Sequence, residues 1–389
     1  MPKCTLRVSA VGQLEEAEIR FGDLTVLVGP QATGKSIFLE LFKLVTDTGA
    51  VLAELRRYGL DWSKDGHKDV GRFLDVYLGE GMQGIWREGR SAMAFNGRAV
   101  DLKRLVSRQR PRREESTFFI PAQRVLTLAR GWPRPFTDYG PGDPFAVRDF
   151  SEKIRRLMES GIGSAESLFP QTRRLKKQIR DSLEKTVFSG YQLRVDKYGA
   201  QKRLVLSPPG EGGPLPFMVW SAGQREFVPL LLGLYWLLPP TKTPRRGNIE
   251  WAVVEEVEMG LHPKAISTVL LLVLDLLARG YRVCMSTHSP HVLDVVWALK
   301  VFQQHHAPPQ RVLDLFQVSR RQDMVNMAER VLEKEARVYY FDPQSGRTRE
   351  ISNLDPGSDD LAEAGWGGLA EFSGHVSDVV AEVVAGSTQ

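Results

Sequence analysis

The sequence predicts an α/β fold built around a parallel sheet, and three observations lead to this prediction. A glycine-rich loop separates the apolar residues 24–28 from a helical segment that begins at residue 37. Two further apolar segments, 249–254 and 282–286, run into polar residues, and the apolar segment 264–279 between them has the length of a helix. A strand, a helix and a second strand in this order form a parallel β-α-β unit, so we expect the polar strand ends to share one edge of the sheet.

The glycine-rich loop fits the pattern G-x-x-x-x-G-K-S, which cradles nucleotide phosphates. Its residues are Gly29, Pro30, Gln31, Ala32, Thr33, Gly34, Lys35 and Ser36. The glycines let backbone N–H groups turn toward phosphate oxygens, and the start of the next helix adds partial positive charge. We expect Lys35 to reach the β- and γ-phosphates of ATP and Ser36 to hold Mg²⁺. A chance glycine-rich turn is the alternative, and the strand–loop–helix context argues against it.

Composition is that of a globular protein rather than a membrane protein. The chain has 389 residues, enough for two or three structural units, and its net charge of +5 permits nucleic-acid contact without requiring it. Cys4 and Cys284 are isolated in apolar contexts, which favours buried thiols in a reducing compartment. The longest apolar run, 227–238, is too short to span a bilayer, and the N-terminus lacks a secretory segment. We therefore expect a cytoplasmic location and no membrane contact.

A second motif, Ser221-Ala222-Gly223-Gln224, precedes a long apolar segment. Ser221 is suited to cap a helix that continues through the apolar residues to 238. On its own the motif indicates only a capped helix. After a phosphate loop it also offers a second helix start that favours an anion.

Paired carboxylates, Glu255 and Glu256, follow the apolar segment 249–254. A buried strand that ends in two acids is typical of a metal–nucleotide site. Adjacent strand residues point to opposite faces, so one of the two could instead be structural, and a strand ending in solvated acids is the plain alternative. His288 ends the next apolar segment. Because one helix joins the two segments, we expect His288 to lie beside Glu256 in a parallel sheet.

Together these motifs resemble the ATP-binding-cassette ATPases of the SMC, RecF and OLD kind, over residues 3–60 and 216–300. The run from Glu255 to Pro263 followed by Ser286 to Pro290 is most similar to the OLD-like branch of AAA-family ATPases. The resemblance implies a cassette-type P-loop ATPase head with a mixed N-terminal sheet, a parallel core sheet, a helical insertion and a C-terminal extension.

The resemblance also assigns roles to the motif residues. It implies that Glu255 assists Mg²⁺, that Glu256 polarises the attacking water and that His288 senses the γ-phosphate. Glu255 departs from the aspartate usual at its position, which could slow hydrolysis. The signature residues would contact the γ-phosphate bound by an opposite protomer; they are Ser221, Gly223 and Gln224.

A strand that runs from 118 into polar residues lies where the family places its Mg²⁺-contacting glutamine loop. Gln123 is the candidate metal contact and Arg124 the second choice, with an ordinary strand-to-loop transition as the alternative. The expected divisions are 1–130 and 216–300 for the two parts of the ATPase head, 131–215 for a helical and β insertion, and 301–389 for the C-terminal extension.

Basic residues at 103–113 and on a helix near 173–180 could attract DNA, although interleaved acids favour a solvated face. The acids of 301–389 lie in a Pro/Gly/Ser-rich loop without the D-x-D cluster of a topoisomerase–primase-like nuclease. We therefore expect no intrinsic nuclease activity.

The sequence thus predicts an ATP-binding and ATP-hydrolysing switch protein that forms a homo-oligomer through composite ATP sites. By resemblance, it would control an effector, a nuclease or a toxin, in anti-phage defence. A RecF-like ATPase of DNA repair or replication is one alternative. A nucleotide-binding scaffold with negligible turnover is another, and it follows if Glu255 disables Mg²⁺ handling. Whether DNA is bound stays open.

Overall fold

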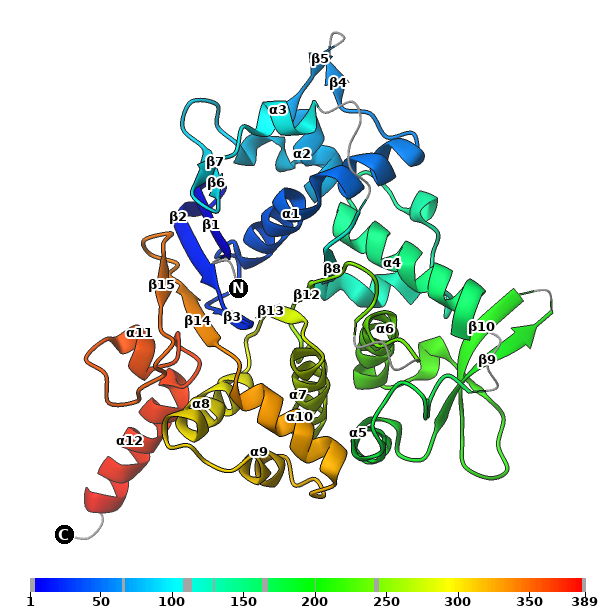
Figure 1. The fold of residues 1–389 in the computed structure, drawn as a ribbon, viewed down its shortest axis with the longest axis vertical. Helices are drawn as coiled ribbons and strands as arrows, with labels where there is room; N and C mark the ends of the chain where they lie inside the picture. Colours follow the sequence, from blue (N-terminus) through cyan, green and yellow to red (C-terminus); the bar gives the residue numbers. More distant parts are fainter. Residues whose placement is uncertain are drawn as a thin grey trace.

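A six-stranded sheet forms the centre of the protein (Figure 1). The computed structural model describes residues 4–64, 67–107, 114–128, 130–162, 167–199, 201–240 and 245–386. The strand order is β15-β14-β3-β13-β12-β8, and every neighbouring pair is parallel except β14 with β15. The strands are β3 (Leu24–Val28), β8 (Thr117–Ile120), β12 (Trp251–Val254), β13 (Arg282–Ser286), β14 (Ala336–Phe341) and β15 (Thr348–Glu350).

Alternate residues of the parallel strands feed two separate hydrophobic cores. Val26 and Val254 belong to one core, while Leu27 and Val253 belong to the other. This alternation follows from the two-residue period of a strand buried on both faces. The sheet is therefore a layer between the two cores. Packing on both of its faces fixes the positions of the strand ends.

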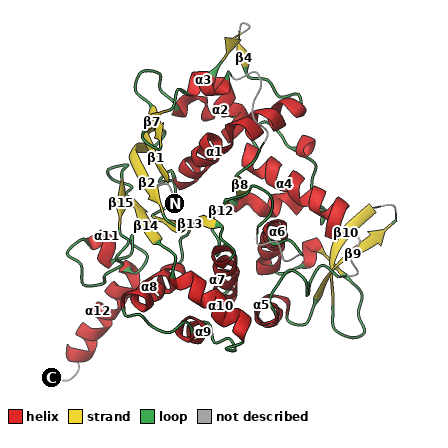
Figure 2. Cartoon of the chain, in the orientation of Figure 1, coloured by secondary structure: helices red, strands yellow, loops and turns green. Residues whose placement is uncertain are grey.

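The first core is formed with helices from the middle and the C-terminal part of the chain, seen around the central strands in Figure 2. These helices are α4 (Phe145–Leu157), α5 (Lys177–Leu183), α6 (Ala222–Leu237), α7 (Pro263–Ala278), α8 (Pro290–Gln304), α9 (Gln310–Leu315) and α10 (Gln322–Leu332). The predicted helix 264–279 is confirmed as α7, and the predicted apolar helix ending near 238 is confirmed as α6. Among the described helices, none is long and apolar enough to cross a bilayer.

The second core lies between the sheet and the N-terminal part of the chain. Helix α1 (Lys35–Arg57) follows the phosphate loop, as expected from the sequence. A second sheet of order β2-β1-β6-β7 packs there with antiparallel pairings, and one parallel bridge joins Glu16 to Arg347. Its strands and the nearby elements are β1 (Cys4–Val11), β2 (Leu14–Phe21), β6 (Ala92–Phe95), β7 (Arg98–Ala99), β4 (Ser63–Lys64), β5 (His67–Lys68), α2 (Val70–Leu78) and α3 (Leu102–Val106).

The middle of the chain adds a three-stranded antiparallel arm of order β11-β10-β9. The strands are β9 (Gln192–Tyr198), β10 (Gln201–Ser207) and β11 (Leu215–Pro216). A short 3₁₀ segment, η2 (Ala122–Leu128), connects β8 to the loop that reaches this arm. The arm projects from the body on the side of α4 and α6 (Figure 2).

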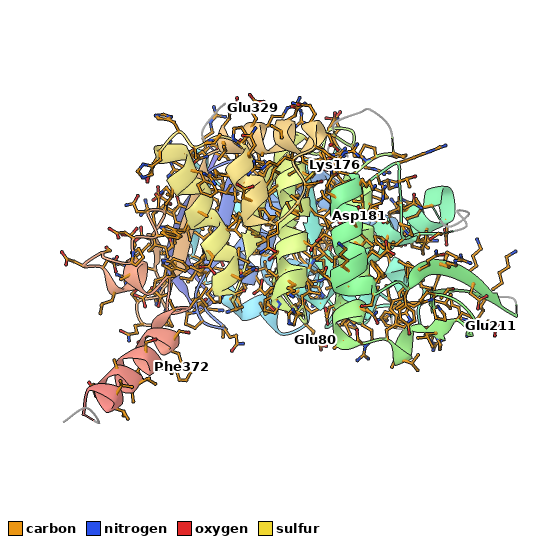
Figure 3. The ribbon with its side chains drawn as sticks, turned by 90° about the horizontal axis from the view of Figure 1, so that it is seen from below. Glu80, Lys176, Asp181, Glu211, Glu329 and Phe372 are labelled. Atoms are coloured by element: carbon orange, nitrogen blue, oxygen red, sulfur yellow. The ribbon has the colours of Figure 1, made fainter. Side chains whose placement is uncertain are left out.

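The segment 301–389 contributes β14 directly beside the phosphate-loop strand β3. Strands β14 and β15 pair as an antiparallel hairpin, with Tyr339 opposite Glu350. Beyond it, α11 (Leu361–Ala364) and α12 (Glu371–Gly386) end the described chain. Helix α12 extends away from the body in two perpendicular views (Figures 1 and 3). The C-terminal residues therefore form both a core strand and a projecting helix.

Candidate functional site

The phosphate loop leaves β3 with two glycines in conformations that side chains disfavour. Gly29 has φ +140° and Gly34 has φ +91°. A Cβ at Gly29 would lie 2.6 Å from the carbonyl oxygen of Phe341, and one at Gly34 would lie 2.6 Å from Leu14 Cδ2. The strand β14 and the β1–β2 turn thus pack directly against the loop. Only glycine fits these two positions, which matches a loop shaped to present its backbone.

Lys35 is buried inside this loop. Its Nζ donates to the carbonyl oxygens of Gly29 and Pro30 at 2.7 and 2.6 Å. Burial lowers the pKa of the Lys35 ammonium to about 8, although Glu256 opposes this shift. The ammonium therefore occupies a cradle of loop oxygens, and phosphate oxygens are stronger acceptors for the same charge. The loop fits a nucleotide phosphate.

Glu255 follows the last residue of β12 and is buried. Its Oε2 accepts a hydrogen bond from the Ala122 N–H at 3.1 Å, whereas Oε1 has no hydrogen-bond partner within the described residues. Burial raises the pKa of this carboxyl, and the nearby Ser36 hydroxyl lowers it in part. An unsatisfied buried carboxylate oxygen beside a hydroxyl is a suitable pair of oxygen ligands for Mg²⁺.

Glu256 stands where the chain turns out of β12. Its φ is +42°, and its backbone N–H donates to Ser286 Oγ at 3.1 Å. Its Oε1 lies 3.9 Å from His288 Nε2, with 34% of the Glu256 side chain and 26% of the His288 side chain exposed. The expectation that His288 lies beside Glu256 is confirmed, because β12 and β13 pair in parallel. Burial, and next the charge of Lys35, lower the pKa of His288.

A small pocket of about 140 Å³ brings these segments together. It combines most of the phosphate loop with groups from two strand ends and the β1–β2 turn. The residues that line it are Gln13, Gln31, Ala32, Thr33, Gly34, Lys35, Ser36, Ile37, Glu256, Ser286 and His288. A cationic cradle and a carboxylate–imidazole pair therefore face one space.

The sequence offered Arg124 as a second candidate, after Gln123, for a metal contact. In the structure its side chain binds backbone carbonyl oxygens instead. Its guanidinium is fully buried and donates to the carbonyl oxygens of Glu255 and Glu256 at 2.9 and 3.0 Å. Its Nε also donates to the carbonyl oxygen of Glu226 on α6, at 3.3 Å. Arg124 thus ties the carboxylate turn to the helix of the second motif through backbone oxygens.

Glu258 was not singled out from the sequence, although it is the third acid of the run Glu255 to Glu258. Its Oε1 accepts the backbone N–H of His288 at 2.5 Å. The carboxylate thereby fixes the turn that follows β13. A third acid, two residues after a carboxylate pair that ends a buried strand, could have indicated this contact.

The chain matches a family model described as an AAA domain, putative AbiEii toxin, Type IV TA system, over residues 97–294. This range covers more than half of the chain and includes β8, α6, β12, α7 and β13. The chain belongs to this AAA family. The phosphate loop at 29–36 precedes the matched range, so its assignment depends on the loop motif and the geometry above.

Two solved structures similar to this AAA-family protein are SMC head domains. One is an SMC head bound to the C-winged helix domain of ScpA, with 10% identity, a TM-score of 0.42, and coverage of 89% of this chain and 95% of that one. The other is the SMC head domain from Thermotoga maritima, with 16% identity, a TM-score of 0.32, and coverage of 76% and 92%. No curated protein matches the chain.

The second motif of the AAA domain forms the start of α6, apart from the pocket. Ser221 caps the helix by accepting the Gln224 N–H at 3.2 Å, and the Gln224 side chain returns a bond to the Ser221 N–H. A Cβ at Gly223 would lie 3.1 Å from the Gly260 carbonyl oxygen, so the helix start packs on the carboxylate turn. Ser221 itself is exposed. The motif therefore begins at the surface, whereas Gly223 and Gln224 are partly buried.

Gln123 is exposed and does not line the pocket of about 140 Å³. Its neighbour Ala122 supplies the N–H that holds Glu255. A metal contact by Gln123 stays a prediction that would require its side chain to turn toward Ser36.

The basic residues expected near 173–180 are used largely inside the AAA-family protein. Arg174 donates to the carbonyl oxygens of Tyr235 and Leu238, at 2.8 and 2.7 Å. Lys176 pairs with Asp275. Of the other basic segment, 103–113, residues 108–113 lie outside the described residues. The expected helix is wrong for the first half of this segment, because residues 172–174 form a turn and α5 begins only at Lys177. The segment 173–180 thus offers fewer free charges than its sequence implies.

Proposed function

We propose that this AAA-family protein is a Mg²⁺-dependent ATPase that uses ATP as a conformational switch. The observation that carries the proposal is the convergence of Lys35, Glu256 and His288 on one pocket lined by the phosphate loop. The buried Glu255 lies behind them with an unsatisfied oxygen. A charged cradle next to a carboxylate base is the arrangement needed for phosphoryl transfer to water.

Each group has a role suited to its surroundings. Lys35 binds phosphate oxygens, and Ser36 and Glu255 would hold Mg²⁺, which neutralises phosphate charge when bound. Glu256 is partly exposed, so it can orient a water molecule and accept its proton. His288 lies within reach of the same water and can report on the occupied pocket. Arg124 keeps both carboxylates in place through their backbone oxygens.

We further propose that two protomers close around ATP. The start of α6 is exposed at Ser221 and Ala222, and the N-terminus of a helix attracts an anion. Just before it, Met218 and Val219 are 65% and 62% exposed. Exposed apolar side chains beside a phosphate-binding motif are suited to a protomer interface. In this arrangement Ser221, Gly223 and Gln224 complete the site of the opposite protomer.

The ATP switch would control a partner effector in anti-phage defence, in the cytoplasm. The family description names a toxin of a toxin–antitoxin system. Helix α12 is a reason to propose a protein partner, because exposed apolar side chains on a helix are typical of an interaction surface. These are Phe372, Val376, Val379, Val380 and Val383. Figure 3 shows Phe372 on the part of the helix nearest the body.

The dimer can be tested by measuring molar mass in solution by light scattering, with and without Mg²⁺–ATP. The variant Glu256→Gln should trap an ATP-bound dimer, because closure precedes hydrolysis. The same variant with Ser221→Arg should bind ATP and stay monomeric. A dimer that forms equally well without nucleotide, or with both substitutions, would contradict the switch.

A further inference from the structure

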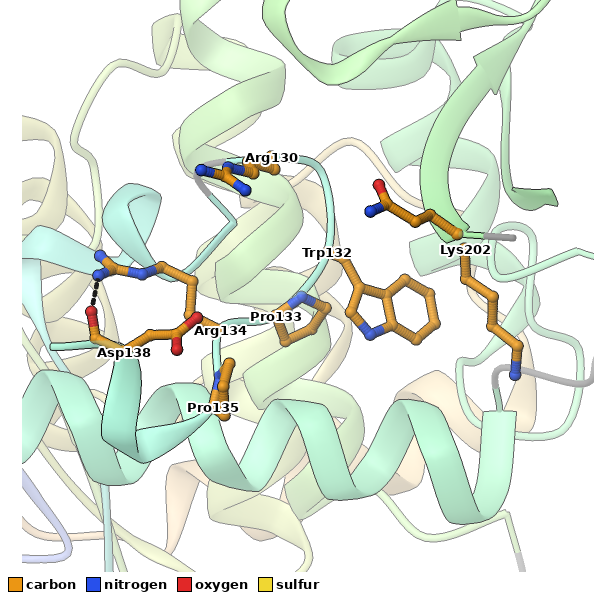
Figure 4. Close-up of a pocket in the computed structure, with 8 residues that line it drawn as sticks. Arg130, Trp132, Pro133, Arg134, Pro135, Asp138 and Lys202 are labelled. Carbon is orange, nitrogen blue, oxygen red and sulfur yellow. Dashed lines mark hydrogen bonds between the residues drawn. The ribbon is translucent and has the colours of Figure 1, made fainter. Parts of the chain in front are cut away.

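A second pocket, much larger than the ATP site, lies between the loop 130–138 and the start of β10 (Figure 4). Its volume is about 780 Å³. The loop is held firmly: the Gly131 carbonyl oxygen accepts the Leu204 N–H at 2.7 Å, and the Arg134 N–H donates to the Thr127 carbonyl oxygen at 3.0 Å. The pocket is therefore a preformed surface of the protein.

The pocket has an excess of positive charge. Arg130, Arg134 and Lys202 line it together with one acid, Asp138. Arg134 donates to the backbone oxygen of Asp138 and not to its carboxylate, as the dashed line in Figure 4 shows. Within the part of the chain that the structure describes, none of these three cations forms an ion pair. Uncompensated cations in a concave site favour an anionic ligand.

The β9–β10 hairpin extends this charge. Its register places Lys197 directly opposite Lys202, and both side chains are exposed. Like charges directly opposite each other destabilise a hairpin. The next pair along the hairpin, Arg203 and Asp196, carries opposite charges and forms a salt bridge at 2.9 Å. The lysine pair thus continues the positive surface of the pocket along the arm.

An aromatic ring completes the pocket. Trp132 packs one side against the hydrophobic core and remains partly exposed, and Lys202 Nζ lies 5.9 Å from its ring centroid. Figure 4 shows Trp132 between Lys202 on one side and Pro133 on the other. Arg134 also lies over a ring, that of Tyr139, at 4.0 Å from its centroid. A partly exposed indole among cations that form no ion pair is the combination by which proteins hold single-stranded nucleic acid, with a base stacked on the ring and phosphates on the cations. A duplex would leave the indole unused.

We propose that this pocket and the lysine pair bind single-stranded nucleic acid with little sequence preference, at a site separate from the ATP pocket. Binding should fall steeply with salt, because the contacts to phosphates release counterions. A free nucleotide shares the base and phosphate chemistry but reaches only part of the surface, so it should bind much more weakly than a chain of nucleotides.

The test is fluorescence anisotropy of a labelled oligo-dT of 20 nucleotides with the full chain at 50 and 200 mM salt. Trp132→Ala should weaken binding by about tenfold or more, and Trp132→Phe should restore much of it, since a phenyl ring still stacks. Lys197→Glu with Lys202→Glu should weaken binding and flatten its salt dependence. Two controls should stay within about twofold of wild type: Trp297→Ala on α8, and Lys334→Glu before β14.

Thermal melting and ATP binding would show that each variant is folded. Absence of oligo-dT binding at 50 mM salt would overturn the proposal, as would binding that is indifferent to Trp132→Ala. A duplex of equal length that binds more tightly would replace it with a duplex-binding surface. Equal affinity for dTMP and oligo-dT would indicate a small-nucleotide pocket. Displacement by poly-glutamate of equal charge, with no dependence on Trp132, would indicate an acidic protein partner.

Discussion

Glu256 Oε1 and His288 Nε2 lie 3.9 Å apart at the carboxyl ends of two neighbouring parallel strands. The separation leaves both groups free to face the phosphate loop, and both line the same pocket. The positive φ of Glu256 marks the turn by which the chain leaves β12. This pair is the centre of the proposed hydrolytic site.

Glu256→Gln should retain ATP binding and lower turnover by about 100-fold or more, because the amide cannot accept the proton of the attacking water. Nucleotide affinity and phosphate release measure the two effects separately. Glu250→Gln, an exposed change just before the opposite end of the same strand, is the matched control and should behave as wild type. Unchanged turnover in Glu256→Gln would remove this residue from the mechanism.

Lys35→Ala should weaken ATP binding by about 100-fold or more, since it removes a charge-assisted hydrogen bond to the phosphates. Titration with a fluorescent ATP analogue measures this loss. Lys334→Ala changes a partly exposed lysine that does not line the phosphate-loop pocket, and it should leave affinity unaltered. Wild-type affinity in Lys35→Ala would mean that the loop does not hold the nucleotide.

Ser221→Arg should allow ATP binding by each protomer but abolish turnover, because the added side chain occupies a helix start meant for phosphate. Ser221→Ala is the control: it removes the cap, at a cost of about 1 kcal/mol of stability, without adding a cation. Mixing Ser221→Arg with Glu256→Gln creates dimers with at most one competent site, and phosphate release measures their activity. If Ser221→Arg hydrolyses ATP like wild type, the opposite-protomer role is ruled out.

Glu115 should make the free energy of unfolding decrease as the pH falls. Burial alone would raise the pKa of this carboxyl, but Lys153 and Lys43 hold it below its usual range. The folded protein therefore gains stability above the unfolded pKa of about 4.3 and loses it as pH falls through the folded value. Glu115→Gln should lower the free energy of unfolding by about 3 kcal/mol at pH 7.

Denaturant unfolding at several pH values between about 5 and 2 measures this effect, and the variant should show a shallower loss. Lys43 also pairs with Asp47, and Lys153 with Asp149, so the two cations stay partly compensated in the variant. Glu329→Gln on the exposed face of α10 is the matched control. Equal slopes for wild type and Glu115→Gln would contradict the prediction.

The purified chain with ATP and Mg²⁺ or Mn²⁺ should hydrolyse ATP and leave plasmid, linear DNA and RNA intact. Phosphate contacts position nucleic acid but do not cut it, and cleavage requires a further carboxylate cluster. Gel assays over hours measure the outcome. Metal-dependent cleavage that persists in Glu256→Gln would reveal a nuclease site outside the ATP pocket.

The sequence by itself determined the local elements of the site. The phosphate loop, the strand 24–28, the carboxylate strand and the helix 264–279 all have strong local signals, because glycine spacing and apolar runs depend only on neighbouring residues. The proximity of Glu256 and His288 also followed from the sequence. Two strands joined by a single helix pair in parallel through a right-handed crossover, which brings their carboxyl ends to the same edge of the sheet.

Tertiary structure alone decided contacts between distant segments. Arg124 bonds to carbonyl oxygens more than 100 residues away, and the sequence offered it only as a metal contact. The sequence predicts a basic helix over residues 173–180. In the structure Arg174 instead donates to a backbone carbonyl oxygen of α6, and Lys176 pairs with Asp275. The pocket around Trp132 arises where a loop meets a hairpin some 70 residues later. Local patterns set which elements form, whereas the direction and surroundings of each charge depend on how those elements pack.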